Sequence, residues 1–240
     1  MNDAYIGDIG DYGKYGLLKT LKQETGFQLG VAWMKTASPV FEYLERDELV
    51  ACDPELYQSL RGLVRGSRRT IAGLEESKAL PEDTIYFNKQ FVFRGKKAQQ
   101  RLRSEWFGEA LDRLEDANLV FFDPDNGLET SLKKGSTVEG PKNVRYKELK
   151  PFYERGKSLV VYQHAERRKG GMKETIRVRT SDLKRELGCK KIWALRWHRV
   201  QSRVYFLIPT LEHRASLEKA IHSFEETKWC TGGHFTVQEI

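Results

Sequence analysis

Short apolar runs alternate with amphipathic stretches along most of the chain. The runs at 28–34, 119–122 and 158–162 have the length and composition of buried strands. Apolar side chains recur at helical spacing between and beyond them, so helices are expected at 14–24, 54–64, 97–114, 146–154, 173–187 and 211–224. This alternation predicts βαβ units and a parallel sheet.

The last third of the chain has a different pattern. Two apolar runs, 191–197 and 203–208, are separated by a short polar link, which predicts an antiparallel hairpin. A final short strand is expected at 235–238. The whole chain is therefore predicted to be one Rossmann-like three-layer α/β domain, with a mostly parallel sheet and a C-terminal antiparallel hairpin. The stretch 67–95 has no clear period and is interpreted as a possible insertion rich in basic and aromatic residues.

In open α/β sheets the ligand site lies beyond the carboxyl ends of the strands. The residues that follow the first three expected strands are therefore candidates. They are Lys35, the segment 123–129, and Gln163 with His164.

The strongest local signal is Asp123-Pro124-Asp125-Asn126-Gly127, directly after a buried apolar strand. Asp-Pro and Asn-Gly are ordinary turn formers, so a plain turn is the alternative reading. Two carboxylates and an amide, with Glu129 close behind, are more polarity than a turn needs. Asp123, Asp125 and Asn126 are therefore candidate catalytic residues.

A second signal lies near the N-terminus. Glycines stand at positions 7, 10, 13 and 16, and Asp8, Asp11 and Lys14 follow the same three-residue interval. Glycine lets the backbone approach a ligand closely, and the helix that follows offers free N–H groups at its start. The three polar residues, together with Lys35, are candidate cofactor-binding residues. Helix capping by an aspartate is the structural alternative.

His164 is the third signal, because it follows a buried strand and its ordinary pKa lies near neutrality. It is a candidate acid, base or ligand, and equally a structural residue.

Composition narrows the setting. The longest apolar runs are far shorter than the ~20 residues that cross a bilayer, so no membrane partner is expected. Three widely spaced cysteines, at 52, 189 and 230, predict reduced thiols and a cytoplasmic location.

The chain carries a net charge of +7, which favours a polyanionic partner. The charge falls in three clusters, interleaved with aromatic residues, as suits phosphate neutralisation combined with base stacking. The clusters comprise Arg61, Arg65, Arg68 and Arg69, then Arg94, Lys96, Lys97, Arg101 and Arg103, and then Arg167, Arg168, Lys169, Lys173, Arg177 and Arg179. Nucleic acid is the predicted partner.

With these residues in view, the layout resembles class I S-adenosylmethionine-dependent methyltransferases, and among them the family that methylates adenine N6 in large-subunit ribosomal RNA. The segment 7–15 is similar to that family's Gly-Asn-x-Ala-Asp-x-x-Lys-His element, which lines the cofactor site. Asp123-Pro124-Asp125-Asn126 looks like a variant of its Asp-Pro-Pro-Tyr motif, which holds the target amine. The family's glycine-rich cofactor loop would fall at 31–37, where no glycine stands.

Four functions remain open at this stage. The resemblance implies methyl transfer from S-adenosylmethionine to a base, with Asp123 and Asn126 orienting the amine of an extruded base. A Mg²⁺-dependent nuclease would use Asp123, Asp125 and Glu129 as oxygen ligands. A base-excising glycosylase would use Asp123 and His164, and a methyltransferase-like module would bind nucleic acid without chemistry.

Overall fold

The computed structural model describes residues 6–34, 47–66, 69–90, 95–130, 142–166, 168–199 and 202–240, the side chains of 47 and 95–99 excepted. The main sheet contains β1 (Leu29–Ala32), β2 (Ile85–Phe87), β3 (Leu119–Phe122), β6 (Ser158–His164), β7 (Trp193–Trp197), β8 (Arg203–Ile208) and β9 (Phe235–Glu239). A second, two-stranded sheet pairs β4 (Gly127–Leu128) with β5 (Asn143–Val144).

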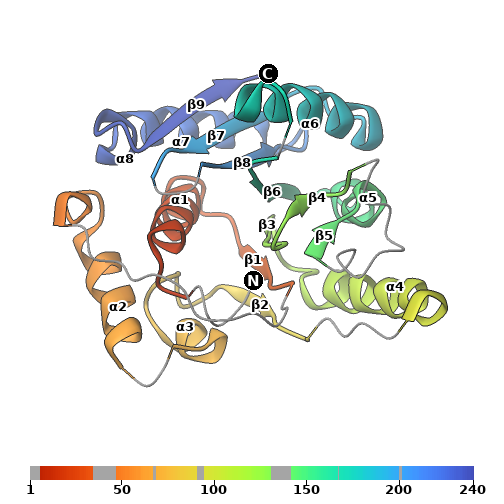
Figure 1. Cartoon of the computed structure of the whole chain (residues 1–240), viewed down its shortest axis with the longest axis horizontal. Coiled ribbons are helices and arrows are strands. Elements are labelled where there is room, and N and C mark those ends of the chain that lie inside the picture. Colours follow the sequence, from red (N-terminus) through yellow and green to blue (C-terminus); the bar gives the residue numbers. More distant parts are fainter. Residues whose placement is uncertain are drawn as a thin grey trace.

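The helices flank the main sheet on both sides (Figure 1). They are α1 (Ile9–Thr25), α2 (Pro54–Arg65), α3 (Ile71–Glu76), α4 (Gly95–Arg113), α5 (Tyr146–Glu154), α6 (Gly171–Leu187), α7 (Arg214–Glu226) and α8 (Lys228–Thr231), with a 3₁₀ turn at Asp47–Leu49. None of the helices in the described ranges is both long and apolar enough to cross a membrane.

The strand order is β2-β1-β3-β6-β8-β7-β9. The first four strands run parallel, whereas β8 runs antiparallel to both β6 and β7, and β9 runs antiparallel to β7. The predicted α/β class, the mostly parallel first part of the sheet and the late hairpin are all confirmed. After β1 the chain adds β2 on one side and then crosses to β3 on the other, so the strand order reverses at β1.

The segment 67–95, interpreted from the sequence as a possible insertion, supplies part of this same sheet. Its described residues form α3 and β2, and β2 pairs in parallel with β1 through the register Val31↔Tyr86. A strand of only three residues at the sheet edge is too short to show a period of two in the sequence.

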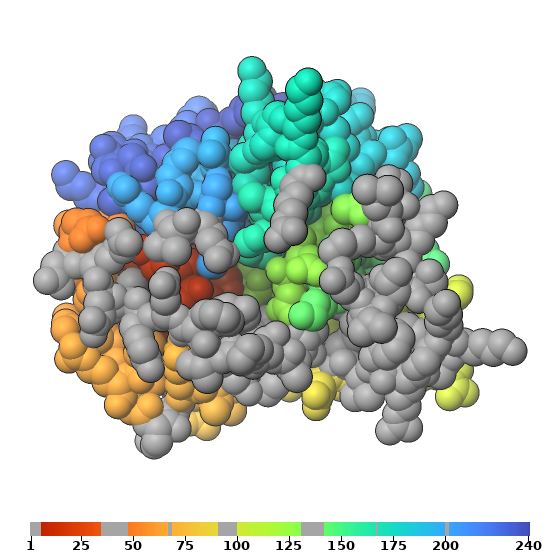
Figure 2. Space-filling model, in the orientation of Figure 1, coloured from red at the N-terminus to blue at the C-terminus, as the bar shows by residue number. Residues whose placement is uncertain are grey.

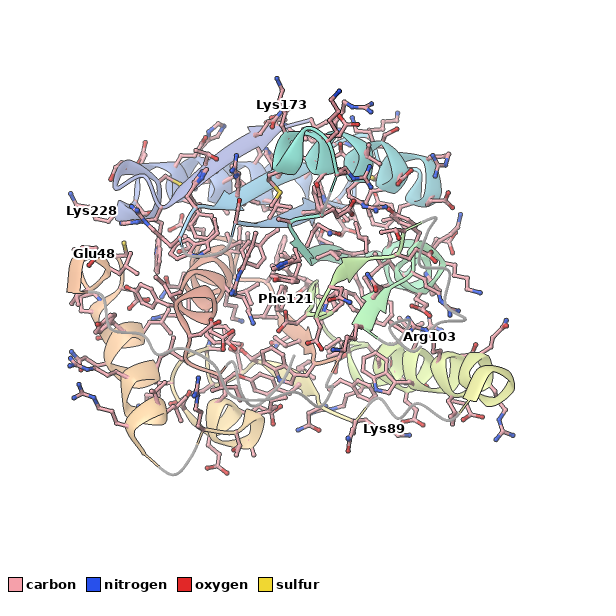
Figure 3. All side chains as sticks on the ribbon, in the orientation of Figure 1. Glu48, Lys89, Arg103, Phe121, Lys173 and Lys228 are labelled. Carbon is pink, nitrogen blue, oxygen red and sulfur yellow. The ribbon has the colours of Figure 1, made fainter. Side chains whose placement is uncertain are left out.

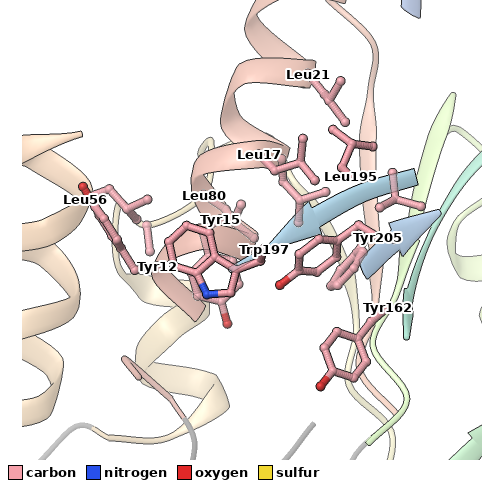
Figure 4. Packing of buried hydrophobic residues seen from close by; sticks show 14 of the residues in the cluster. Tyr12, Tyr15, Leu17, Leu21, Leu56, Leu80, Tyr162, Leu195, Trp197 and Tyr205 are labelled. Carbon is pink, nitrogen blue, oxygen red and sulfur yellow. The ribbon is translucent and has the colours of Figure 1, made fainter. Parts of the chain in front are cut away.

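The core has one half on each face of the sheet. In β3, Leu119 and Phe121 join the cluster covered by α1, α2, α3, α7 and α8, while Val120 and Phe122 join the cluster covered by α4, α5 and α6. Figure 4 shows the first cluster, where side chains of α1 meet those of β6, β7 and β8. Strands buried on both faces read as unbroken apolar runs, which is why β3 and β6 were recognisable in the sequence.

The glycines of α1 are explained by close packing. A Cβ at Gly10 would lie 1.5 Å from Nη1 of Arg203, and one at Gly16 would lie 2.2 Å from the Trp229 ring. Gly13 faces the Trp197 ring in the same way, at 2.8 Å. The interpretation that each glycine lets the backbone approach a ligand is therefore wrong for these three positions. Their three-residue spacing keeps one side of the helix bare, so that bulky side chains can lie directly on its backbone.

We predict opposite effects of the same substitution on two helices. Gly16→Ala is expected to lower the free energy of unfolding, because forcing a methyl group into a filled space costs about 1–3 kcal/mol. Gly108→Ala on α4 has open space around its Cβ and is expected to raise stability by up to about 1 kcal/mol through helix propensity. Thermal or urea unfolding measures both. Equal effects of the two substitutions would contradict the packing role.

Candidate active site

The buried ammonium of Lys14 joins α1 to the end of β3. Its Nζ lies 2.6 Å from Oδ1 of Asp11 and 2.9 Å from Oδ2 of Asp123, and all three side chains are almost fully buried. The same Nζ lies 6.0 Å from the ring centre of Phe121, which is labelled at the centre of Figure 3. The structure thus brings together two motifs that are more than a hundred residues apart in the sequence.

The electrostatics of this group follow from its burial. Burial alone would lower the pKa of Lys14, but the carboxylates of Asp11 and Asp123 outweigh it and raise that pKa above its ordinary value. Burial raises the pKa of Asp11 from 3.8 to about 6; Lys14 opposes this rise, whereas Asp8 adds to it. Lys14 is therefore a permanent cation, and Asp11 is a carboxyl group that titrates near neutrality.

Asp8 caps the N-terminus of α1, as the structural alternative for this motif expected. Its Oδ1 accepts a hydrogen bond of 2.7 Å from the amide of Asp11, and Nη2 of Arg203 lies 3.3 Å from its Oδ2. The Asp11 carboxylate in turn accepts a 3.1 Å hydrogen bond from the amide of Gly7. Capping and the candidate site are therefore parts of one network, since the cap fixes the turn that presents Asp11 and Lys14.

Arg203 belongs to this network and was missed in the sequence. It begins β8, directly opposite His164 at the end of β6, and its guanidinium lies 5.9 Å from the ring centre of Tyr162. Because β8 is antiparallel, its first residue lies at the same edge as the last residues of the parallel strands. The hairpin predicted from the sequence implies this position, because the second strand of the hairpin begins at the edge where the parallel strands end.

The turn after β3 is held by Gln163, which is buried. The amide of Leu128 donates a 2.8 Å hydrogen bond to Oε1 of Gln163, and the side-chain amide of Gln163 donates to the carbonyl of His164. Gly127 has a φ of +92°, and a Cβ there would lie 2.5 Å from Oε1 of Gln163. Glycine at 127 is thus required on both counts, and the half-buried Asp125 and Asn126 are carried on a fixed turn.

His164 lies at the same edge of the sheet. Its Nδ1 is 3.1 Å from the hydroxyl of Tyr162, and burial together with the nearby Arg203 lowers its pKa, so the imidazole is neutral at pH 7. The hydrogen bond to Tyr162 turns this side chain along its own strand, whereas Asp123 is held by Lys14. The two side chains that the glycosylase hypothesis combines therefore have different partners.

The set of oxygen ligands expected for Mg²⁺ does not assemble. No group of three or more His, Cys, Asp or Glu side chains in the described ranges is placed to hold a metal ion. Oε1 of Glu129 instead accepts a 3.1 Å hydrogen bond from the amide of Tyr146, and burial raises the pKa of this carboxyl group.

The residues predicted to bind nucleic acid have mixed outcomes. Arg68, Arg94 and Arg167, and the side chains of Lys96 and Lys97, lie outside the described residues, as does Lys35, which was predicted to bind the cofactor. Arg69 donates a 2.9 Å hydrogen bond to the carbonyl of Ile6, Arg168 forms an ion pair with Glu166, and Lys169 is exposed.

Two arginines of the predicted basic clusters are internal. Arg103, labelled in Figure 3, is 1% exposed and its Nε donates a 2.6 Å hydrogen bond to Glu148. Arg179 is 2% exposed and pairs with Glu166 at 2.5 Å. Arg103 joins α4 to Glu148 of α5, and Arg179 joins α6 to Glu166, which follows β6. The expectation that these two arginines contribute to a phosphate-binding surface is therefore wrong. Sequence clustering cannot separate the buried side of a helix from its exposed side when both carry arginine.

Two parts of the chain that are distant in the sequence lie side by side on one face of the molecule. Red residues of the amino-terminal part and green residues of the middle of the chain meet near the centre of the face in Figure 2. This matches the contact between Lys14 and Asp123, which joins those two parts of the chain.

No protein-family model matches the sequence, and the comparison with curated proteins finds no relative. Among solved structures, a crystal structure of a Legionella pneumophila protein of the family DUF519 is similar, with a TM-score of 0.44 and 9% sequence identity. The similarity covers 97% of this chain and 98% of the other. A similarity of this size says nothing about activity.

We predict that Asp11 makes stability depend on pH in a defined window. Because its folded-state pKa is raised to about 6 from 3.8, the folded protein binds more protons than the unfolded chain between these values, and the contribution of Asp11 to stability falls as pH rises through them. Asp11→Asn removes this contribution. Removing a partner of Lys14 has a cost at every pH, but the stability of the variant relative to wild type should rise by up to about 3 kcal/mol from pH 4 to pH 7.

Urea unfolding of both proteins at several pH values measures this difference. Comparing the two proteins cancels the titration of the other carboxyl groups. A stability difference that stays constant between pH 4 and pH 7 would show that Asp11 does not titrate in this window.

Proposed function

We propose that this protein modifies nucleic acid at the carboxyl edge of β1 and β3, by transferring a methyl group from S-adenosylmethionine to a base. The observation that carries the proposal is the buried contact between Lys14 and Asp123, which places the N-terminal polar motif against the Asp-Pro-Asp-Asn turn. The proposal extends the resemblance to class I methyltransferases, in which the corresponding elements bind the cofactor and the target amine.

The position of the network supports this proposal. The strand order reverses at β1, and ligands of open α/β sheets bind outside the carboxyl ends of the strands at such a reversal. Asp123 follows β3, the neighbour of β1, and its backbone amide donates a hydrogen bond to the carbonyl of Ala32, the last residue of β1. The acidic group therefore stands at the place where this class of fold binds its ligands.

The charge of the network supports a cationic ligand. Among the ion pairs of the described residues, the three carboxylates of Asp8, Asp11 and Asp123 face the two cations of Lys14 and Arg203, so these five groups sum to one negative charge when all are ionised. S-adenosylmethionine is a sulfonium cation, and the exocyclic amine of a base is a hydrogen-bond donor. Both suit a carboxylate-rich site, whereas a bare phosphate would be repelled.

This charge also separates the two leading hypotheses. A phosphodiester at an acidic site needs metal ions to screen it, and the described carboxylates are not grouped as ligands of one ion. A base that enters while its phosphates remain outside needs no such screening. The chain has a net charge of +7, whereas the network is locally acidic. This combination suits a nucleic acid whose phosphates stay at the protein surface while one base enters the site.

Four residues of the network have roles in the proposed reaction. Asp8, Asp11 and Lys14 hold the cofactor, which supplies an electrophilic methyl group when bound. Asp123 accepts a hydrogen bond from the target amine, with Asn126 beside it, and so orients the amine and stabilises the positive charge that it gains. Because Gln163 fixes the turn, these side chains need little rearrangement during the reaction.

We predict that Asp123→Asn lowers the rate of methyl transfer by a factor of 100 or more, because a positioned charge at a reacting centre contributes several kcal/mol to transition-state stabilisation. Asp125→Asn, on the same turn, is the matched control and should retain activity within about fivefold. The measurement is the transfer of labelled methyl groups from S-adenosylmethionine to unmodified RNA and DNA. A metal-dependent nuclease would instead need both carboxylates and would release nucleotides.

The stability of these variants needs a separate control. Asp123 is 4% exposed rather than solvent-facing, and it pairs with a buried cation, so Asp123→Asn is expected to cost about 1–3 kcal/mol. Lys14 keeps Asp11 as a partner, which limits the loss. Unfolding curves establish that the variant is folded at the assay temperature. Full activity of folded Asp123→Asn would refute the proposed role of this residue.

A further inference from the structure

A basic surface that the sequence search did not identify lies beside the proposed active site. We call it the hairpin end and define it as residues 196–199 together with Ser202 and Arg203, where β7 ends and β8 begins. The pairing of His164 with Arg203 places the hairpin end at the carboxyl edge of the parallel strands, and the contact of Arg203 with Asp8 joins it to the active-site network.

Two arginines of the hairpin end have only neutral partners. Nε of Arg196 donates a 3.0 Å hydrogen bond to the hydroxyl of Ser202, and Nε of Arg199 donates a 2.8 Å hydrogen bond to Nδ1 of His234. Neither arginine forms an ion pair with any residue of the described ranges. Both side chains are half-buried, so the charges are held in place by the fold.

Two exposed arginines of α6 differ in this respect, Arg177 of the predicted cluster and Arg185 beyond it. On α6, exposed Arg177 lies 2.7 Å from Glu174, and exposed Arg185 lies 2.9 Å from Asp182. Those arginines already have carboxylate partners. Arg196 and Arg199 therefore differ from these two arginines in having no carboxylate partner among the described residues.

The positive charge of these arginines also lowers the pKa values of the two neighbouring histidines. Burial is the main cause that lowers the pKa of His198, and Arg196 and Arg199 lower it further. Burial and Arg199 also lower the pKa of His234, against the opposing effect of the acidic neighbour Glu48. The histidines are therefore neutral at pH 7, and the charge of the hairpin end resides in its arginines.

We propose that the hairpin end binds the phosphate backbone of the nucleic acid whose base binds at the carboxyl edge of β1 and β3. This inference rests on the proposed function and names the surface that positions its substrate. Nη2 of Arg199 also donates a 3.4 Å hydrogen bond to the carbonyl of Gly232. A guanidinium has five N–H donors, so each of these arginines keeps donors that can bind a phosphate oxygen. Two neighbouring surfaces at one edge of the sheet then have different roles. The arginines of the hairpin end bind the phosphate backbone, and the acidic network binds the base.

The test compares two pairs of substitutions. Arg196→Gln with Arg199→Gln removes the charges but keeps a hydrogen-bonding amide at each position, and Arg177→Gln with Arg185→Gln removes two exposed charges that have carboxylate partners. Affinity for a fluorescent single-stranded RNA and for its DNA counterpart is measured across a salt series. The hairpin-end variant should bind at least tenfold more weakly at low salt, and its plot of log affinity against log salt should be shallower by about 1.4, since each single-strand phosphate contributes about 0.7.

The control pair should change affinity by less than threefold. Arg196→Lys with Arg199→Lys keeps the charge and should restore most of the binding, even if the Gln variant loses stability. Unchanged binding by the folded Gln variant, or an equal loss in the control pair, would refute this surface while leaving the proposed function standing. No binding of RNA or DNA by the wild type would overturn both, and binding of an acidic polypeptide such as polyglutamate instead would assign the surface to a protein partner. Calorimetry with S-adenosylmethionine should give the same affinity for all variants, which shows that the cofactor site is intact.

Discussion

The rest of the structure depends on the ion pairs that the buried ammonium of Lys14 forms with Asp11 and Asp123. A cation that is 3% exposed is stable only when carboxylates surround it, so Asp11 and Asp123 must both be delivered to the same point. That requirement fixes the first turns of α1 against the end of β3. The bare glycine side of α1 makes the fit possible, because it lets Arg203 and two tryptophan rings lie on the helix backbone. The packing of α1 and the assembly of the candidate site therefore depend on the same contacts.

The charge distribution gives this site its chemical character. The chain as a whole is basic, yet the network at the reversal of strand order is locally acidic. In the proposed function, the positive net charge attracts a polyanion, and the carboxylates of the network face the neutral or cationic parts of the ligands. Several arginines that would strengthen the basic surface are instead used inside the molecule, as the pair between Arg103 and Glu148 illustrates. Net charge alone therefore does not show which arginines lie at the surface.

Much of the architecture could be predicted because it depends on the order of apolar and polar residues within single segments of the chain. The runs of β3 and β6 are buried on both faces, and the hairpin of β7 and β8 has a short polar link, so both were recognisable. What escaped prediction depends on contacts between distant residues. The role of Gly16 is set by Trp229, and the place of Arg203 is set by Asp8, 195 residues earlier in the chain. The short edge strand β2 carries too few residues to show any period.

The measurement that tests this account most directly is a crystal structure of the protein with S-adenosylhomocysteine, the product form of the proposed cofactor. We expect density for this molecule at the carboxyl edge of β1 and β3, within hydrogen-bonding distance of Asp8, Asp11 and Lys14, and with its sulfur atom facing the Asp123 carboxylate. A bound molecule at another edge of the sheet, or no bound molecule at saturating concentration, would contradict the account.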